Sequence, residues 1–373
     1  MTRTLIALLL TATSATAAAQ NCGNYSVEEL TPEGGRVDWS PHGQGDMIAF
    51  DHDVKEGRRD GYFDVSVMSV RDKIPTCITC TPAALAEGGL KGNKGQPAWH
   101  PSGEYIVFQA EIENSGVGAK RSNPGRGVGN VLWLTDPAGT WFVQLTDYNS
   151  DGARGVLHPH FHVSEKGGTQ LSWSEMYAPW HPTEPGQGAG LWRLKKATLN
   201  LDVFPPRLEQ MEELLMPERV RPGFYENHGF SPDGGLIIFS SNALRDGVLD
   251  SINNDIFTFD LASGAVTRLT DMGYNEHASF FPDGRHVLWM TNRRNPDRGT
   301  DLWVMERPRL RARDQRLTYF NVAGCPGAEE GQVMIVADSS LNAAGTEAVV
   351  FVQRGLFDDG GPIFRVTLPP LPF

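Results

Sequence analysis

The stretch Phe230-Ser-Pro-Asp-Gly234, followed by Leu236-Ile-Ile-Phe239, decides the fold of this chain. Pro fixes φ, Asp caps a turn and Gly accepts a positive φ, so the stretch predicts a tight turn between two strands. Related segments recur at intervals of 60, 62, 69, 50 and 61 residues. They begin at an aromatic residue or, in the last copy, at a leucine: Trp39, Trp99, Phe161, Phe230, Phe280 and Leu341. The chain is therefore built from six copies of one unit.

Each unit contains enough strand-forming sequence for a four-stranded sheet. A β-branched and aromatic run follows every turn, and a third run comes later, as in Ile256-Phe-Thr-Phe259. A fourth run ends in Leu-Thr, as in Arg268-Leu-Thr-Asp271. Because a single four-stranded sheet cannot bury both faces, stacking the units around an axis is the stable solution. We predict an all-β fold, a six-bladed β-propeller of four-stranded blades.

The two ends of the chain predict how the ring closes. Glu28-Glu-Leu-Thr31 has the fourth-strand pattern but precedes the first unit, and the last unit ends after its third strand. We expect residues near 25–31 to pair with the strand near 363–368, which removes an exposed sheet edge.

The repeat resembles that of the TolB-like (PD40, WD40-like) β-propeller family. Phe230-Ser-Pro-Asp-Gly234, Asp255-Ile-Phe257 and Arg268-Leu-Thr-Asp271 carry the resemblance, which extends over nearly the whole chain after residue 19. It implies a binding module of the cell envelope. No α/β domain precedes the repeats, so the cell-envelope role of TolB itself does not transfer with the fold.

The N-terminus predicts secretion. Arg3, an apolar run Leu5–Leu10 and the small residues Ala17-Ala-Ala19 are typical of a signal peptide over residues 1–19. Residues 20–373 then form one propeller domain in the periplasm or outside the cell. The formal net charge of −12 argues against nucleic acid as a partner, and no later apolar stretch is long enough for membrane insertion.

Four cysteines remain after residue 19, and their pairing is open from sequence alone. Cys77-Ile-Thr-Cys80 has the spacing of a zinc or redox motif, but the segment has a strand pattern and no second such pair exists. In an extended strand these two cysteines would lie too far apart to bridge.

Long insertions between the second and third strands identify one face of the ring, the loop-rich face, as functional. Histidines enter three consecutive blades on that face, in His158-Pro-His160, Tyr225-Glu-Asn-His228 and Tyr274-Asn-Glu-His277. Imidazole with carboxylate suits a divalent transition metal, and the alternative is that these histidines only cap strand starts. The candidate metal residues are His158, His160, His228, His277, Glu226 and Glu276, and the candidate ligand-binding residues are Tyr225, Asn227, Tyr274, Arg293 and Arg294.

Two functions from different classes remain open. The first is a periplasmic or secreted binding or scaffold protein for a small molecule, a saccharide or an envelope protein. The alternative is a metal-assisted lyase or hydrolase that acts on an anionic saccharide through the histidines. His158-Pro-His160 resembles the His-x-His of oligogalacturonate lyases, which implies a manganese site, although the Gln expected three residues earlier is Gly155. The chain contains no G-x-S-x-G serine elbow, which argues against a serine peptidase.

Overall fold

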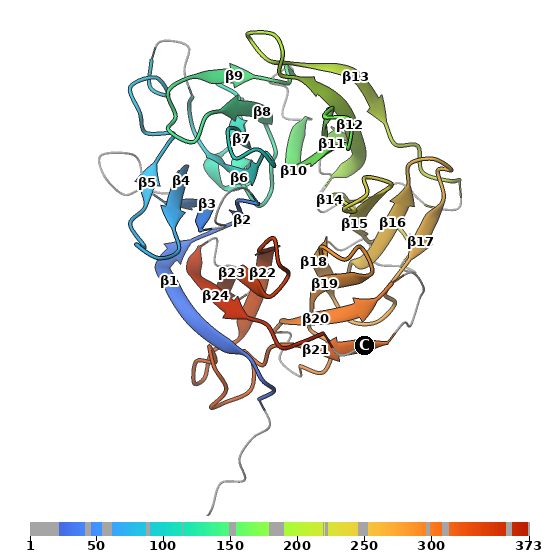
Figure 1. Ribbon diagram of the computed structural model, residues 1–373. Helices are drawn as coiled ribbons and strands as arrows, with labels where there is room; N and C mark the ends of the chain where they lie inside the picture. The colour runs from blue at the N-terminus through green and yellow to red at the C-terminus, as the bar shows by residue number, and fades with distance from the viewer. Residues whose placement is uncertain are drawn as a thin grey trace, which may run out of the picture.

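Six antiparallel four-stranded sheets form a ring of blades around a central axis (Figure 1). This computed structural model describes residues 22–41, 46–53, 62–86, 90–113, 115–148, 154–178, 190–218, 220, 223–244, 253–295, 299–307, 313–355 and 360–371. The prediction of an all-β, six-bladed propeller is confirmed. The expected signal peptide, residues 1–19, lies outside the described residues.

Each blade runs outward from the axis in chain order, apart from the sixth, whose outer strand comes from the N-terminus. Blades one to three are β2 (Val37–Trp39), β3 (Met47–Asp53), β4 (Phe63–Ser69) and β5 (Thr76–Cys77); β6 (Lys94–Trp99), β7 (Ile106–Glu111), β8 (Asn130–Thr135) and β9 (Phe142–Gln144); β10 (Gly155–Val163), β11 (Thr169–Ala178), β12 (Leu191–Asn200) and β13 (Arg207–Glu213). Blades four to six are β14 (Tyr225–Phe230), β15 (Leu236–Ser241), β16 (Asp255–Asp260) and β17 (Val266–Arg268); β18 (Asn275–Phe280), β19 (His286–Thr291), β20 (Asp301–Glu306) and β21 (Asp314–Arg316); β22 (Met334–Leu341), β23 (Glu347–Arg354), β24 (Gly361–Thr367) and β1 (Ser26–Gly34). The short helix α1 (Ala119–Ser122) lies between β7 and β8.

The Pro-Asp-Gly segments are the turns between the first and second strands, as predicted. Gly234 and Gly284 have φ values of +70° and +64°, which L side chains rarely adopt. In the fourth blade, the Ser231 hydroxyl accepts the Leu236 N–H at 2.9 Å and Asp233 accepts the Gly235 N–H at 3.1 Å. The turn sequence therefore satisfies its own backbone donors.

The N-terminus closes the ring, as expected. Strand β1 pairs antiparallel with β24, with Ser26 opposite Thr367 and Glu29 opposite Phe364. A disulfide between Cys22 and Cys325 fastens the same end of the chain to the connection between the fifth and sixth blades.

Apolar side chains fill the spaces between blades. Ile48 and Phe50 of the first blade pack against Phe351 and Ile363 of the sixth, and all four are fully or almost fully buried. Trp289 and Trp303 join the fourth and fifth blades in the same way. This packing holds the innermost strands at fixed positions around the axis.

The expectation for Cys77 and Cys80 was wrong: they form a disulfide, with their Cα atoms 5.4 Å apart. The extended strand β5 ends at Cys77, and the chain turns over residues 78–80. That turn brings the two sulfurs together. Among the described residues no helix is long and apolar enough to cross a membrane.

Candidate functional site

A repeated irregularity aims side chains at the ring axis. Five of the innermost strands contain a bulge in which two residues oppose one residue of the second strand. The bulged residues are Gln96-Pro97, His158-Pro159, His228-Gly229, His277-Ala278 and Ala337-Asp338. A bulge re-aims a side chain and is common beside functional sites.

Three of these bulges hold a non-glycine residue in left-handed backbone geometry. Gln96, His158 and His277 have φ values of +53°, +49° and +46°. Such a conformation costs about 1–3 kcal/mol per residue and persists where the surroundings impose it. The repetition of this strain at the axis marks the region as a candidate site.

Three histidines from consecutive blades meet at the axis. Nitrogen atoms of His158, His228 and His277 all lie within 4.8 Å of one another. Their ring centroids are 5.3 Å apart for His158 and His228, and 5.5 Å apart for the other two pairs. We call these three residues the histidine cluster. These histidines do not only cap the starts of their strands, because their rings converge on one another.

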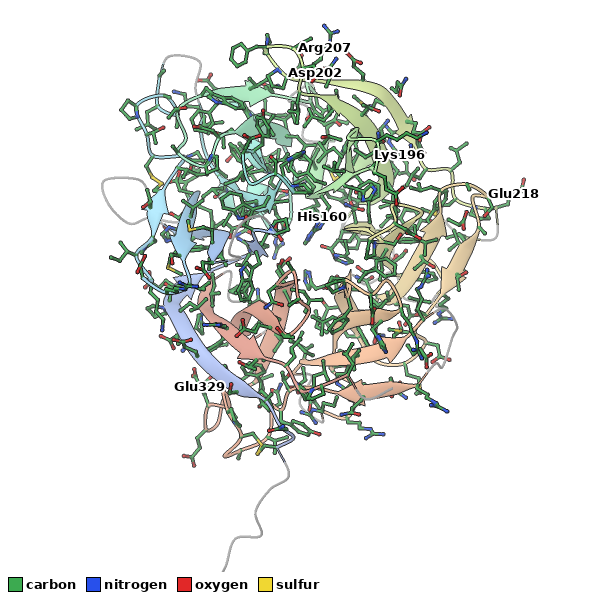
Figure 2. All side chains as sticks on the ribbon, in the orientation of Figure 1. His160, Lys196, Asp202, Arg207, Glu218 and Glu329 are labelled. Atoms are coloured by element: carbon green, nitrogen blue, oxygen red, sulfur yellow. A yellow bond between two sulfur atoms is a disulfide. The ribbon has the colours of Figure 1, made fainter. Side chains whose placement is uncertain are left out.

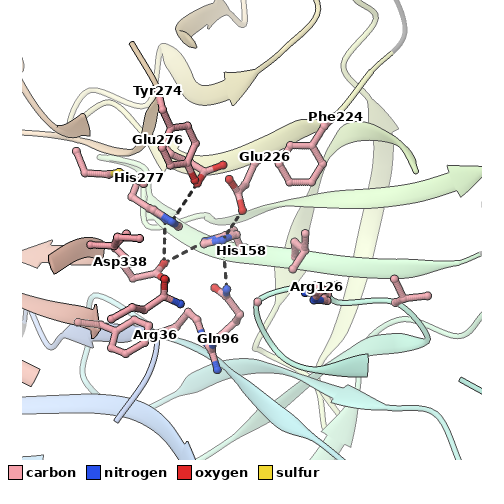
Figure 3. A pocket seen from close by; sticks show the side chains of 18 of the residues that line it. Arg36, Gln96, Arg126, His158, Phe224, Glu226, Tyr274, Glu276, His277 and Asp338 are labelled. Atoms are coloured by element: carbon pink, nitrogen blue, oxygen red, sulfur yellow. Dashed lines mark hydrogen bonds and ion pairs between the residues drawn. The ribbon is translucent and has the colours of Figure 1, made fainter. Parts of the chain in front are cut away.

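Acidic side chains surround the histidine cluster (Figure 3). A Glu226 oxygen lies 2.9 Å from His158 Nε2, and a Glu276 oxygen lies 3.5 Å from His277 Nε2. Asp338 Oδ1 lies 3.2 Å from His277 Nδ1 and 3.7 Å from His158 Nδ1. These carboxylates can orient the rings and fix their tautomers.

Burial separates the protonation states of the histidines. It lowers the pKa of His158 to about 4, against the opposing Asp338 carboxylate, and it lowers the pKa of His228 well below the ordinary value. Burial alone would also lower the pKa of His277, but Asp338, Glu276 and Glu226 outweigh it and raise that pKa to about 10. These shifts favour neutral His158 and His228 and a protonated His277, which must lose that proton before it can ligate a metal.

The two glutamates form a coupled pair. Glu226 and Glu276 are hydrogen-bonded to each other, and burial raises the pKa of both carboxyls. For Glu276 the charge of Glu226 adds to the rise. Tyr274 donates its hydroxyl to Glu276, and Asn254 donates to the other Glu276 oxygen at 2.7 Å. The pair can hold a proton at neutral pH beside the histidine cluster.

Two cavities meet at the histidine cluster from opposite faces. The first, of about 420 Å³, reaches the loop-rich face and is lined there by Arg121, Arg126 and Phe224. The second, of about 360 Å³, reaches the turn face, where Pro41, Pro282 and Asn342 line it. We call them the proximal and the distal cavity. His158, His277, Asp338, Arg36 and Gln96 line both.

A buried ion pair supports the floor of both cavities. Arg36 donates to Asp51 through Nε at 2.9 Å and Nη2 at 2.6 Å, and both side chains are almost fully buried. Asp51 also accepts the Gln96 N–H at 2.9 Å, and the Gln96 side-chain amide lies 3.2 Å from His158 Nε2. The ion pair therefore fixes the strained Gln96 backbone next to the histidine cluster.

His160 was also a candidate metal residue, and the structure places it outside the histidine cluster. Its ring stacks on His158 with centroids 6.5 Å apart, and it points toward the axis (Figure 2), where it lines the distal cavity. Burial and the neighbouring His158 lower the pKa of His160 to about 3.

Of the candidate ligand-binding residues, only Tyr274 lines the proximal cavity. Tyr225 lies in the apolar core between blades, against Phe239. Asn227 donates its side-chain amide to the His158 carbonyl at 2.7 Å, so it supports a strand and does not face a ligand.

The two candidate arginines do not reach the axial cavities. Arg293 forms an ion pair with Asp314, and both Arg293 and Arg294 lie over the Trp303 ring. Arg293 lines a separate cavity that also contains Trp289 and Met272. Arg58, Arg59, Arg245 and Arg298, which the sequence also places in the long insertions, lie outside the described residues.

Sequence reasoning missed Arg36, Gln96 and Asp338, although the repeat contains a signal for them. The residue three positions before the anchor of each repeat lines both cavities in five of six blades: Arg36 before Trp39, Gln96 before Trp99, His158 before Phe161, His277 before Phe280 and Asp338 before Leu341. In the fourth blade the bulge lies one residue later, so His228 stands there instead and lines the distal cavity.

Known proteins resemble this chain over most of its fold but over only short stretches of its sequence. No family model matches the chain. Dipeptidyl-peptidase 5 of Porphyromonas endodontalis is 41% identical over 69 residues, and that of Porphyromonas gingivalis is 32% identical over 74 residues. These matches cover 17% and 19% of this chain, and only 10% and 11% of the two peptidases.

Solved structures of similar shape are propellers with different activities. An oligogalacturonate lyase from Vibrio parahaemolyticus has a TM-score of 0.51 at 10% identity, covering 93% of this chain and 97% of that one. A gluconolactonase from Xanthomonas campestris has 0.50 at 12% identity, covering 95% and 94%. The hydrazine synthase of Kuenenia stuttgartiensis has 0.53 at 11% identity, covering 89% and 43%. At these identities the likeness establishes one thing, that the chain is a β-propeller.

Proposed function

We propose that the protein binds a divalent transition metal at His158, His228 and His277, and that it acts on an anionic small molecule of the saccharide class in the proximal cavity. One observation carries the proposal: three buried imidazoles from consecutive blades converge where two cavities meet. Converging, strained and buried ionisable groups in a cavity are typical of a functional site.

The residues of the site fit a metal. Three imidazole nitrogens within 4.8 Å of one another need only small shifts to share an ion. Imidazole with carboxylate suits zinc, iron, nickel or copper, and Glu226, Glu276 and Asp338 stand where they would orient the three rings. When bound, such an ion supplies Lewis-acid chemistry toward a substrate oxygen.

The residues of the chain supply binding and proton transfer. Arg121 and Arg126 are exposed at the mouth of the proximal cavity, and neither forms an ion pair within the described part of the chain. They are suited to hold a carboxylate or phosphate of the ligand. Burial raises the pKa of both carboxyls of the Glu226–Glu276 pair, most strongly that of Glu276, so the pair is suited to hold a proton that it donates to a leaving oxygen. This division of roles suits a lyase or a hydrolase.

The proposal includes the expected location and family. Both disulfides support an oxidising compartment, such as the periplasm or the cell exterior. The repeat supports kinship with TolB-like propellers, as in Phe230-Ser-Pro-Asp-Gly234.

Elemental analysis of protein purified without a histidine tag tests the proposal. We expect a stoichiometric transition metal in the native protein and its loss in the His228→Ala/His277→Ala variant. His162→Ala is the matched control, because His162 lies beside Gly234 on the turn face and lines a different cavity. Native protein that takes up no metal from zinc, manganese, iron, nickel or copper solutions refutes the proposal.

A binding or scaffold protein is the second candidate function. The exposed Arg121 and Arg126 favour it, since they could hold an anionic small molecule or an envelope protein without any chemistry. Metal-free protein that still binds an oligogalacturonate by calorimetry, and does not change it, would favour this candidate.

A further inference from the structure

Three blades contain the same buried aspartate at the start of the third strand. These are Asp64, Asp255 and Asp301, all fully buried. In each blade a threonine that follows the fourth strand donates its hydroxyl to this aspartate: Thr79 at 2.8 Å, Thr270 at 3.2 Å and Thr318 at 3.2 Å. The aspartate and threonine are therefore one structural element of the repeat.

The first blade departs from this element at one position. In blades four and five the residue two before the threonine is an arginine, and Arg268 and Arg316 bind the aspartates at 2.5 Å and 2.6 Å. In the first blade that position is Cys77, disulfide-bonded to Cys80. The cation comes instead from the next blade, where Lys94 Nζ lies 3.1 Å from Asp64.

The substitution places a buried carboxylate against a disulfide. An Asp64 oxygen and the sulfurs of Cys77 and Cys80 lie within 4.8 Å of one another. Asp64 and Lys94 have side-chain exposures of 0% and 2%, whereas both cysteines are half-buried and can be reached from solvent. The arrangement is an accessible Cys-x-x-Cys pair backed by an inaccessible Asp–Lys pair.

Two exposed apolar side chains lie close to this pair in the sequence. Ile74, which is 72% exposed, precedes Cys77 by three residues, and Leu85, 51% exposed, follows Cys80 by five. Exposed large apolar side chains next to a reactive group favour contact with another molecule.

We propose that Cys77 and Cys80 form a redox-active disulfide that exchanges with thiols, and that Asp64 moves the proton. The Asp64 carboxylate takes the proton of an incoming thiol, the resulting thiolate attacks one sulfur, the Cys77–Cys80 bond breaks, and the leaving sulfur takes the electron pair and that same proton back from Asp64. A second thiol then displaces the mixed disulfide. Two external thiols are oxidised to one disulfide, their two protons end on the cysteines, and the reverse reaction returns them.

The chemistry of the surroundings suits this role. A Cys-x-x-Cys spacing favours the thiolate that exchange requires. The Asp64 carboxylate, which has an oxygen within 4.8 Å of both sulfurs, gives an incoming thiol a fixed proton acceptor. Among the described residues, the ionisable groups that face Asp64 are Lys94 and His52; the pKa of His52 is lowered by burial, and Asp64 partly opposes that shift.

The test measures exchange in a glutathione redox buffer and, separately, with reduced ribonuclease A, by alkylation and mass spectrometry of the native protein. We expect Cys77–Cys80 to exchange while Cys22–Cys325 stays oxidised. Faster exchange with reduced ribonuclease identifies a polypeptide thiol as the substrate, and faster exchange with glutathione identifies a small thiol.

The variant Asp64→Asn should slow exchange at pH 7 by about tenfold or more and flatten its dependence on pH. Asp255→Asn is the matched control, because it removes the same repeat element in a blade without cysteines and should leave exchange unchanged. Exchange of Cys77–Cys80 no faster than that of Cys22–Cys325, or equal slowing by both variants, overturns the proposal.

Discussion

The two disulfides should contribute very different amounts to the free energy of unfolding. Cys22 and Cys325 are 303 residues apart, whereas Cys77 and Cys80 are three apart. In the chain-entropy account, a loop of the first size constrains the unfolded chain by about 5 to 6 kcal/mol and one of the second size by about 2 kcal/mol. Domains are typically stable by about 5–15 kcal/mol, so losing the first bond removes much of the total.

The assay is equilibrium urea unfolding of the native protein, Cys22→Ser/Cys325→Ser and Cys77→Ser/Cys80→Ser. We expect the first variant to unfold at a much lower urea concentration, since the segment that leads into β1 loses its covalent link to the connection between the fifth and sixth blades. The second variant should stay within about 2 kcal/mol of the native protein. An equal or larger loss in the second variant would show that ring closure does not depend on Cys22–Cys325.

Three further predictions follow from the axial region. Asp38 accepts the Trp99 N–H at 2.7 Å, and burial raises its pKa to about 6 from 3.8; its contribution to stability is present below pH 3.8 and lost as the pH rises through 6. This pH-dependent part of the free energy of unfolding is at most about 3 kcal/mol, because the Asp38 side chain is partly exposed to the distal cavity. The Asp38→Asn variant cannot ionise at this position, so its free energy of unfolding should lack this dependence between pH 4 and 7. Gly95→Ala should destabilise the fold by about 1–3 kcal/mol in thermal unfolding, because its Cβ would lie 2.4 Å from Asp51 Oδ2; unchanged stability would contradict the packing described here. Arg126→Ala should weaken binding of an oligogalacturonate in calorimetry while leaving the melting temperature unchanged, and equal affinity would exclude this arginine from the ligand site.

The fold could be predicted from the sequence because each repeat contains the residues that form its own turn and strands. Pro-Asp-Gly turns such as 232–234 fix strand direction, and the spacing of anchors fixes the number of blades. The unmatched Leu-Thr near residue 31 predicted ring closure for the same reason, since a lone fourth strand needs a partner.

The histidine cluster was only partly readable. Histidines that enter consecutive blades must approach the axis, so His158, His228 and His277 were placed together correctly in space. The likeness of Tyr225-Glu-Asn-His228 to Tyr274-Asn-Glu-His277 misled, however, because the bulge lies one residue later in the fourth blade relative to its anchor. Counted from the anchors, Tyr225 lies five residues before Phe230, whereas Tyr274 lies six residues before Phe280. Because side-chain direction alternates along a strand, Tyr225 packs into the core while Tyr274 lines the cavity.

The other residues discussed above could not be predicted from local sequence patterns. Asp338 and Gln96 are ordinary polar residues in sequence, and only the bulges turn them toward the axis. The Cys77–Cys80 bridge depends on where β5 ends, and strand ends are the least determined feature of a sequence pattern.

The most direct test of the central claim is anomalous X-ray diffraction from a crystal of the native protein soaked in a divalent transition metal. We expect one strong peak at the axis, about 2.0–2.2 Å from a nitrogen of each of His158, His228 and His277. We also expect this peak to disappear in His228→Ala/His277→Ala. A native crystal with no axial peak, or with metal bound only at surface carboxylates, would contradict it.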